Sequence, residues 1–362
     1  MSIGLSQTSL PFALEGSAAL FSEERQEIYD LDGSAAAVVA DLVEPQPLAG
    51  LYDKFDTGMR NGTGWLDAFL CDLSDKGLLS IKMETRGAHP GRALRSILPF
   101  DRSAISLEAS PDCSAWFSAW SHLPRSAGAP LRAVAAPWRK LGIVTVTGLP
   151  GRLVPADLLP AAFRFRVVEA VLATSSSIAL HCASLIMGNT LVLLLGEPGA
   201  GKSTLAMCAA RREMRLAGDD IALIDTAQGV IRPLPLPPTL KEGSWDRFGD
   251  DAGPAIAMHR TTRQDGVEVG YLPLPGYSAP PEIERCVFVA IQRRHEGAAA
   301  LRAGRKQDFL RRLCADSRSS SGRASVEDMD AMIALLQKGD VADLTYSDAS
   351  DAADLLAERL VR

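Results

Sequence analysis

The stretch LVLLLGEPGAGKSTLAMCAARREMRLAGDDIALID, residues 191–225, constrains the fold of this chain more than any other. An apolar run leads into GEPGAGKS, residues 196–203, which fits the pattern G-x-x-x-x-G-K-S/T, and a helix-prone segment follows it. Glycines in such a loop let backbone N–H groups surround a phosphate, and the start of the following helix adds partial positive charge. The sequence therefore predicts a strand, a phosphate-binding loop and a helix within an α/β domain.

The residue types in this loop indicate which of them bind a nucleotide and its metal. Lys202 can reach the β- and γ-phosphates of ATP, and the Ser203 hydroxyl can ligate Mg²⁺. We therefore expect ATP and Mg²⁺ as cofactors. The predicted nucleotide-binding residues are Gly196, Glu197, Pro198, Gly199, Ala200, Gly201, Lys202, Ser203 and Thr204.

Two adjacent carboxylates, Asp219 and Asp220, follow the loop and precede the apolar run IALID. One carboxylate facing a phosphate loop can hold Mg²⁺ while the other accepts a proton from an incoming hydroxyl. Asp225, at the far end of that run, is the alternative acidic residue. His181 lies in IALHCASLIM, which we expect to form one strand before the loop. A lone histidine in an apolar run is usually a packed core residue.

Secondary-structure patterns divide the chain into three parts. Residues 11–82 contain short β-prone runs, three helical candidates and a final extended run, which predicts a small winged-helix-like α+β domain. Residues 83–135 are rich in Pro and Gly, so we expect an irregular connector with one short helix, in which Trp116 and Trp120 pack. Residues 136–362 alternate strands and helices, which predicts the α/β domain that contains the phosphate loop.

Charge and hydropathy exclude several classes of partner. The chain of 362 residues has a net charge of −6 at pH 7, which disfavours nucleic acid as a partner. No apolar run is long enough to span a membrane, and the first residues lack the features of a signal peptide. The 6 cysteines have no C-x-x-C spacing, as in a reducing compartment. We therefore expect a cytoplasmic protein that binds neither nucleic acid nor membrane.

The order of His181, a strand, the phosphate loop, a helix and the two aspartates resembles the catalytic core of HPr kinase/phosphorylase. The spacings agree, because 21 residues separate His181 from Lys202 and 17 separate Lys202 from Asp219. That family has a phosphate loop within a fold like that of phosphoenolpyruvate carboxykinase, and it phosphorylates a serine on a small protein. The resemblance implies that His181 and Asp219 form the proton-accepting pair. It also implies that Asp220 assists Mg²⁺, while Lys202 and Ser203 bind the triphosphate.

The segment IRPLPLPPTLKEGSWD, residues 231–246, departs from the RGLG-type signature of that family. It looks more like the HPr-kinase-related proteins encoded beside peptide-modification enzymes. Lys241 in this segment is a candidate phosphate or substrate contact, and an exposed loop lysine is the alternative. Because HPr kinases are hexameric, the resemblance also raises the expectation of a homo-oligomer.

The first domain is similar to PqqD and its relatives, which recognise precursors of ribosomally made, post-translationally modified peptides such as lasso peptides. ALFSEERQEIYDLDGSAAAVVADLV followed by WLDAFLCDLSDKGLL carries this resemblance. Such modules bind a leader peptide as an added strand, through main-chain hydrogen bonds and side-chain pockets. The resemblance implies a precursor peptide as the partner. The expected leader-binding residues are Glu27, Ile28, Tyr29, Asp30, Leu31, Trp65 and Asp72.

On an extended strand, Ile28 and Asp30 would face one side while Tyr29 and Leu31 face the other. Residues 1–82 carry a net charge of −8, so a leader containing Lys or Arg would gain on-rate and register.

Three functions fit the sequence. The first is a Ser/Thr kinase that phosphorylates a precursor peptide bound through its leader. The second is a small-molecule kinase for a serine-like hydroxyl, which would need no peptide-binding domain. The third is a nucleotide-binding regulatory protein without transfer chemistry, which would need no proton acceptor such as the pair that the HPr-kinase resemblance implies.

Overall fold

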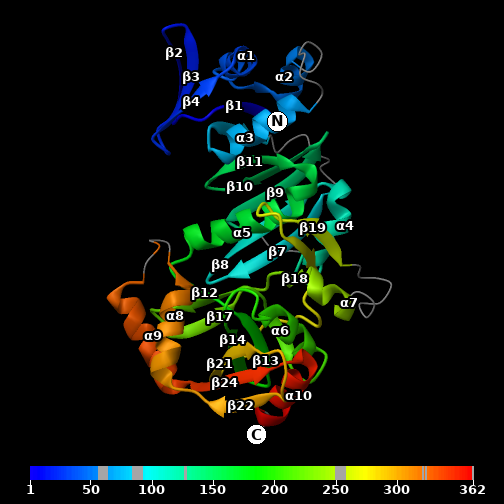
Figure 1. The fold of residues 1–362 in the computed structure, drawn as a ribbon, viewed down its shortest axis with the longest axis vertical. Helices are drawn as coiled ribbons and strands as arrows, with labels where there is room; N and C mark the ends of the chain where they lie inside the picture. The colour runs from blue at the N-terminus through cyan, green and yellow to red at the C-terminus, as the bar shows by residue number, and fades with distance from the viewer. Residues whose placement is uncertain are drawn as a thin grey trace.

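The computed structural model describes residues 1–55, 64–83, 93–125, 129–248, 258–319, 322 and 324–360. It is a mixed α/β structure with several separate sheets. Figure 1 shows three regions in succession along the long axis. The N-terminal residues lie at one end, a five-stranded sheet lies in the middle, and the region that contains the phosphate loop lies at the other end, with the C-terminus.

Two small sheets and three helices make up the N-terminal region. One sheet has the order β5-β1-β6 and the other the order β2-β3-β4. The elements are β1 (Ser2–Leu5), β2 (Ser9–Leu14), β3 (Ser17–Ser22), β4 (Glu27–Leu31), α1 (Gly33–Asp41), β5 (Gln46–Pro47), α2 (Leu48–Phe55), α3 (Trp65–Asp75) and β6 (Leu79–Lys82). Because β1 pairs along its whole length with β6, this region includes residues that precede the predicted boundary at residue 11.

The middle region is built on a mixed sheet with the order β11-β10-β9-β8-β7. Neighbouring strands are antiparallel except for β8 and β9, which are parallel. Its elements are β7 (Leu94–Phe100), β8 (Ser103–Ala109), α4 (Ser114–Phe117), β9 (Leu131–Trp138), β10 (Leu141–Val146), β11 (Leu149–Pro155) and α5 (Leu159–Thr174). Strands β7 and β8 and the start of β9 fall within the expected connector, residues 83–135, so that expectation differs from the structure. Pro111 follows the end of β8 and Pro130 precedes the start of β9, whereas Pro99 lies within β7. Trp116 and Trp120 both contact Phe163 of α5, with ring centroids 5.4 and 5.9 Å away, as packing residues.

The N-terminal region and the middle sheet share one hydrophobic core. Leu141, Ile143 and Leu153 of the sheet are buried in the same cluster as the side chains of α1, α2, α3 and β6. The backbone N–H of Leu153 donates to the Ser74 hydroxyl at 2.8 Å. At Gly151 an added Cβ would come within 2.8 Å of Ile81, so β6 and β11 approach too closely for a side chain. The N-terminal region is therefore fixed to the sheet by packing.

Three sheets make up the C-terminal region. The six-stranded sheet has the order β15-β13-β14-β21-β24-β22, the four-stranded sheet β17-β16-β12-β23, and the three-stranded sheet β18-β20-β19. The strands are β12 (Ile178–His181), β13 (Ala183–Met187), β14 (Thr190–Leu195), β15 (Arg215–Gly218), β16 (Ile221–Asp225), β17 (Val230–Pro233), β18 (Thr239–Lys241), β19 (His259–Thr262), β20 (Glu268–Tyr271), β21 (Arg285–Arg293), β22 (Ala300–Ala303), β23 (Ser317–Arg318) and β24 (Asp340–Tyr346). The helices are α6 (Lys202–Ala210), α7 (Trp245–Phe248), α8 (Lys306–Asp316), α9 (Val326–Lys338) and α10 (Ala349–Leu360).

Strand β14 lies near the centre of the six-stranded sheet and is buried on both faces. Val192 and Leu194 pack in the cluster that includes α6 and α10, while Leu191, Leu193 and Leu195 pack in the cluster that includes α8 and α9. Figure 1 shows these helix pairs on opposite sides of the sheet. A strand covered on both faces reads as an unbroken apolar run, which is the pattern that predicts it in the sequence.

Candidate active site

The phosphate loop connects the end of β14 to the start of α6, as the motif requires. Gly199 and Gly201 have φ values of 88° and 94°, in the left-handed region that favours glycine. At Gly201 an added Cβ would also lie 2.7 Å from the Tyr346 hydroxyl. Tyr346 donates to the Ala200 carbonyl at 2.9 Å, so β24 holds the loop from one side. Gly201 is therefore required both by conformation and by space.

Lys202, the first residue of α6, is only 8% exposed. Its Nζ donates to the Gly196 carbonyl at 2.6 Å. Burial lowers the pKa of Lys202, and the carboxylates of Asp316, Asp219 and Asp220 oppose that shift. Asp316, at the end of α8, is a neighbour of this lysine that the sequence did not indicate.

The histidine and the paired aspartates lie where two strand segments cross from one sheet to another. The predicted single strand IALHCASLIM is two strands, because β12 belongs to the four-stranded sheet and β13 to the six-stranded sheet. Likewise β15 and β16 belong to different sheets, with Asp219 and Asp220 between them. The Cys182 N–H donates to the Asp220 carbonyl at 3.2 Å, so the two crossings lie side by side. This arrangement places side chains of both crossings beside the phosphate loop.

The Asp220 carboxylate contacts two side chains, one through each oxygen. Its Oδ1 lies 3.2 Å from His181 Nε2, and its Oδ2 lies 3.0 Å from Arg164 Nη1. Its backbone has a φ of 80°, a conformation that costs energy for a residue other than glycine. Burial raises the pKa of the Asp220 carboxyl, but Arg164 and then His181 outweigh burial and hold this pKa well below its usual value. Asp220 is therefore a carboxylate that stays ionised.

Asp219 differs from Asp220 in its surroundings and in the direction of its pKa shift. It is 2% exposed, and its carboxylate accepts the Thr239 N–H at 2.9 Å. Burial and the charge of Asp220 raise the pKa of Asp219, while Thr239, Arg164 and the Ser203 hydroxyl oppose the shift. The side chain that contacts His181 is thus Asp220, whereas the resemblance implied Asp219 as the partner of His181 in the proton-accepting pair. Asp219 instead lies beside Ser203, the first residue after Lys202 in α6.

Arg164 of α5 is the site residue that sequence reasoning missed. Its side chain is 11% exposed, and its Nε and Nη2 atoms are buried without a hydrogen-bond partner among the described residues. Its guanidinium also lies 5.9 Å from the centroid of the Tyr271 ring. The available signal was helical spacing, because Arg164 follows Pro160 by four residues and precedes Val167 by three, on the buried stripe of the helix. An arginine on such a stripe needs a carboxylate partner.

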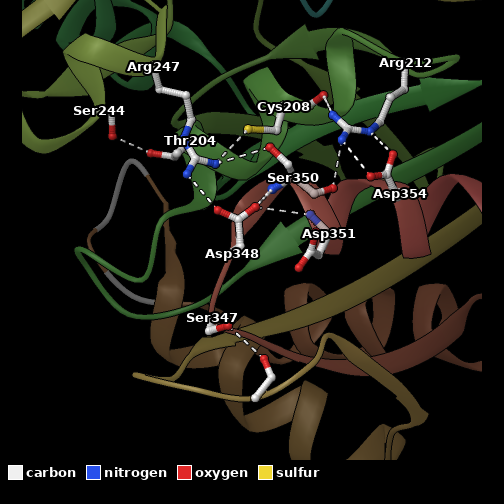
Figure 2. A network of polar contacts seen from close by, with 11 residues as sticks. Thr204, Cys208, Arg212, Ser244, Arg247, Ser347, Asp348, Ser350, Asp351 and Asp354 are labelled. Carbon is white, nitrogen blue, oxygen red and sulfur yellow. Dashed lines mark hydrogen bonds and ion pairs between the residues drawn. The ribbon is translucent and has the colours of Figure 1, made fainter.

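A polar network connects α6 and the residues that follow it to neighbouring elements (Figure 2). Arg247 of α7 donates to Asp348 at 2.8 Å and to Cys208 Sγ at 3.8 Å. Thr204 and Ser244 share a hydrogen bond of 2.7 Å, and Arg212 pairs with Asp354 of α10. These contacts tie α6 to α7 and α10, which fixes the direction in which the start of α6 points.

The motif implies Mg²⁺, and the residues around Ser203 fit it. No three His, Cys, Asp or Glu side chains form a metal cluster in the part of the chain that the structure describes. Mg²⁺ bound with a nucleotide needs only one or two protein ligands, because phosphate and water oxygens complete its shell. Ser203 and Asp219 supply such oxygens, and the buried Thr239 hydroxyl beside Asp219 has no partner among the described residues. The donor set is thus all oxygen, as Mg²⁺ prefers.

Two other predicted residues lie apart from this cluster. Asp225 pairs with Arg232 at 3.0 Å and accepts the Gln228 N–H at 3.0 Å, so it stabilises the β16–β17 turn. Lys241 is exposed on β18, two residues beyond Thr239 and therefore on the same face of that strand.

The predicted leader-binding strand is β4, which forms an edge of the β2-β3-β4 sheet. Ile28 and Asp30 are exposed, while Tyr29 and Leu31 are half-buried against the core, so the predicted alternation is confirmed. Lys76, which follows α3, lies with its Nζ 4.6 Å from the Tyr29 ring centroid.

The two predicted leader contacts on α3, Trp65 and Asp72, each contact a neighbouring side chain on or just after that helix. Trp65 stacks on Phe69 with ring centroids 5.1 Å apart, and Asp72 pairs with Lys76 at 2.6 Å.

Comparison with solved structures finds similar chains, whereas two other comparisons find none. No family model matches the chain, and no curated protein matches it. The Hpr(Ser) kinase/phosphatase from Coxiella burnetii, a solved structure, is similar to it at 14% sequence identity and a TM-score of 0.24. The alignment covers 51% of this chain and 93% of that one. In the described residues, no helix is long and apolar enough to cross a membrane.

Proposed function

We propose that this protein is a cytoplasmic, ATP- and Mg²⁺-dependent kinase that phosphorylates a Ser or Thr hydroxyl of a precursor peptide. The observation that carries the proposal is the Asp220 carboxyl group beside the phosphate loop, which lies 3.2 Å from His181 and 3.0 Å from Arg164. A protein that only senses nucleotides needs no carboxylate maintained in this way, whereas phosphoryl transfer to a hydroxyl needs a group that orients the nucleophile and receives its proton.

The residues divide the work as follows. The loop N–H groups and Lys202 bind the phosphates, and Ser203 with Asp219 holds Mg²⁺, which neutralises charge on the phosphates when it is bound. Asp220 orients the acceptor hydroxyl and takes its proton. The hydroxyl oxygen bonds to the γ-phosphorus, the bond from that phosphorus to the β-phosphate oxygen breaks, and ADP leaves. Relative to the sequence-based roles, those of Asp219 and Asp220 are exchanged.

The N-terminal region supports a peptide as the acceptor. Strand β4 offers a sheet edge, and the half-buried Tyr29 and Leu31 line its inner side next to α3. A leader added to this edge would gain main-chain hydrogen bonds, and the net charge of −8 in residues 1–82 favours a leader that carries Lys or Arg. A kinase for a free small molecule has no use for such an edge.

The test is transfer of label from γ-labelled ATP, with Mg²⁺, to three acceptors offered separately. These are a full-length precursor peptide whose leader carries Lys or Arg, its leaderless core, and free L-serine. We expect label on the full precursor, less on the core and none on L-serine. Preferential labelling of L-serine would identify a small-molecule kinase instead. Binding of ATP without transfer to any acceptor would identify a regulatory nucleotide-binding protein.

A further inference from the structure

A cavity near the candidate active site has no role in the chemistry described above. We call it the indole cleft. It has a volume of about 540 Å³, and it is lined by Trp116, Asp157, Pro160, Trp245, Arg260 and Glu268, among others. These residues come from α4, from the start of α5 and the turn before it, from α7, and from strands β19 and β20. The cleft is therefore formed jointly by the middle and C-terminal regions.

Helix α5 brings the cleft close to Asp220. Pro160 lines the cleft, and Arg164, which pairs with Asp220, follows it by four residues. Residues separated by four positions lie on the same face of a helix, about one turn or 5.4 Å apart. The distance from the cleft to the proposed proton acceptor is thus of the order of one helical turn plus one side chain.

Strand β18 and the start of α7 give a second connection. Trp245 donates from Nε1 to the Leu240 carbonyl at 3.0 Å, and the neighbouring Thr239 donates to Asp219 at 2.9 Å. Ser244, next to Trp245, shares a 2.7 Å hydrogen bond with Thr204 of α6. The indole floor of the cleft is therefore fixed by hydrogen bonds to the segments that hold the carboxylates and the phosphate loop.

The walls of the cleft suit a cationic side chain. Trp116 and Trp245 are 7% and 8% exposed, so each indole offers only part of its surface to the cleft. Asp157 and Glu268 are exposed carboxylates that form no ion pair with any described residue. Aromatic rings attract cations through their electron-rich faces, and unpaired carboxylates add Coulomb attraction.

The cleft already holds one cation of its own. The guanidinium carbon of Arg260 lies 4.5 Å from the centroid of the Trp245 ring. Arg260 is exposed on β19, an edge strand, and forms no ion pair among the described residues. Its position shows that a guanidinium fits over this indole, while both carboxylates remain available to a second cation.

We propose that the indole cleft binds a lysine or arginine side chain of the acceptor, within about three residues of the phosphorylated hydroxyl. The spacing follows from the distance of about one helical turn to Asp220 and a rise of about 3.3 Å per residue in an extended peptide. This inference rests on the proposed kinase function and adds a sequence requirement to its substrate. The positive residue is separate from any that the leader presents to β4.

The first experiment measures binding without catalysis. N-acetyl-arginine amide is titrated into the full-length protein, and the indole N–H signals are followed by NMR, with N-acetyl-norleucine amide as the uncharged probe. We expect a saturable shift at Trp245 with the arginine probe only. The double variant Asp157→Asn/Glu268→Gln should weaken this binding about fivefold to tenfold, the effect of losing two partly exposed charge contacts. The matched control Glu327→Gln/Asp330→Asn, which removes two exposed carboxylates on α9, should leave it unchanged.

The second experiment measures transfer to a Ser-containing acceptor peptide in which arginine or norleucine stands at each position from three before to three after the serine. One position should show a KM about tenfold lower with arginine, and the Asp157/Glu268 double variant should remove that preference. Equal binding of the two amide probes, or arginine binding that survives in the double variant, would overturn the proposal. Arginine binding with no transfer to any acceptor would retain a cation site and reject the kinase.

Discussion

The candidate functional residues of the phosphate-loop region are buried, whereas several of those on the β4 edge are exposed. Asp219 and Lys202 are 2% and 8% exposed. Burial raises the pKa of Asp219 and lowers the pKa of Lys202. On β4, in contrast, Ile28 is 62% exposed and its neighbour Asp30 is exposed as well. Proton transfer requires control over charge, which burial and fixed partners provide. Recognition of an added strand requires only an open backbone edge and accessible side chains.

The two regions are nevertheless parts of one packed structure. Leu141, Ile143 and Leu153 of the middle sheet are buried against the N-terminal region, and α5 of the same middle region supplies Arg164 to the active site. Deleting residues 1–82 would expose that apolar surface and disturb the helix that holds Asp220. The contrast between the regions is therefore tested with single substitutions in the full chain.

The largest effect is expected at the phosphate loop. Lys202→Ala removes the buried cation that we propose to bind the phosphates, so ATP binding should be lost and transfer should fall by at least about 10³-fold. Isothermal titration calorimetry with ATP and Mg²⁺ measures binding directly. The control is Lys338→Ala, which removes an exposed lysine at the end of α9. Unchanged ATP affinity in folded Lys202→Ala would show that the loop is not the nucleotide site.

Replacement by asparagine should have a different effect at each of the two adjacent aspartates. Asp220→Asn should keep ATP affinity and reduce transfer by about 10²–10⁴-fold, the range for loss of a general base. Asp219→Asn should instead raise the Mg²⁺ concentration needed for half-maximal activity, because it removes an oxygen ligand. The reverse pattern, with Asp219→Asn losing transfer at saturating Mg²⁺, would restore the roles implied by the resemblance.

The sequence predicted the elements of the site more reliably than their partners. The phosphate loop with its flanking strand and helix follows from a local motif, because the whole pattern lies within residues 196–203. His181 was indicated only by the resemblance to HPr kinase/phosphorylase. The choice between Asp219 and Asp220 does not follow from such spacing. It depends on two strands that leave their sheet at Cys182 and Asp220, and on Arg164, which lies 56 residues from Asp220 in the chain.

The middle sheet was missed for a related reason. Its parallel pair, β8 and β9, is separated by a segment with short helical turns, and β7 and β8 fall within the expected connector. Short strands interrupted by Pro and Gly carry little periodicity. In contrast, the alternation of exposed and half-buried residues on β4 was predicted correctly, because a strand with one covered face shows a period of two.

A third prediction concerns Arg164, which we regard as a positioning residue. The positive charge of Arg164 makes the largest contribution to lowering the pKa of Asp220, against the effect of burial. Asp220 acts in its ionised form, which exists above its pKa, so Arg164→Gln should move the acid limb of the kcat/KM profile to higher pH. Near pH 8 the loss should shrink to about tenfold, from misplacement alone. Arg164→Lys should restore most of the profile, and an unmoved acid limb in Arg164→Gln would reject this role.

The smallest effect is expected on β4, where contacts are exposed and screened. Asp30→Lys reverses one charge on the proposed leader-binding edge without disturbing the buried Tyr29 face. It should raise the KM for a Lys- or Arg-containing precursor by about threefold to fivefold, leave the leaderless core unaffected, and lose its effect as salt rises. Glu44→Lys makes the same change of net charge at an exposed position away from β4. An equal effect of both variants would indicate the overall negative field of the region, and no effect of either would show that the leader does not bind at this edge.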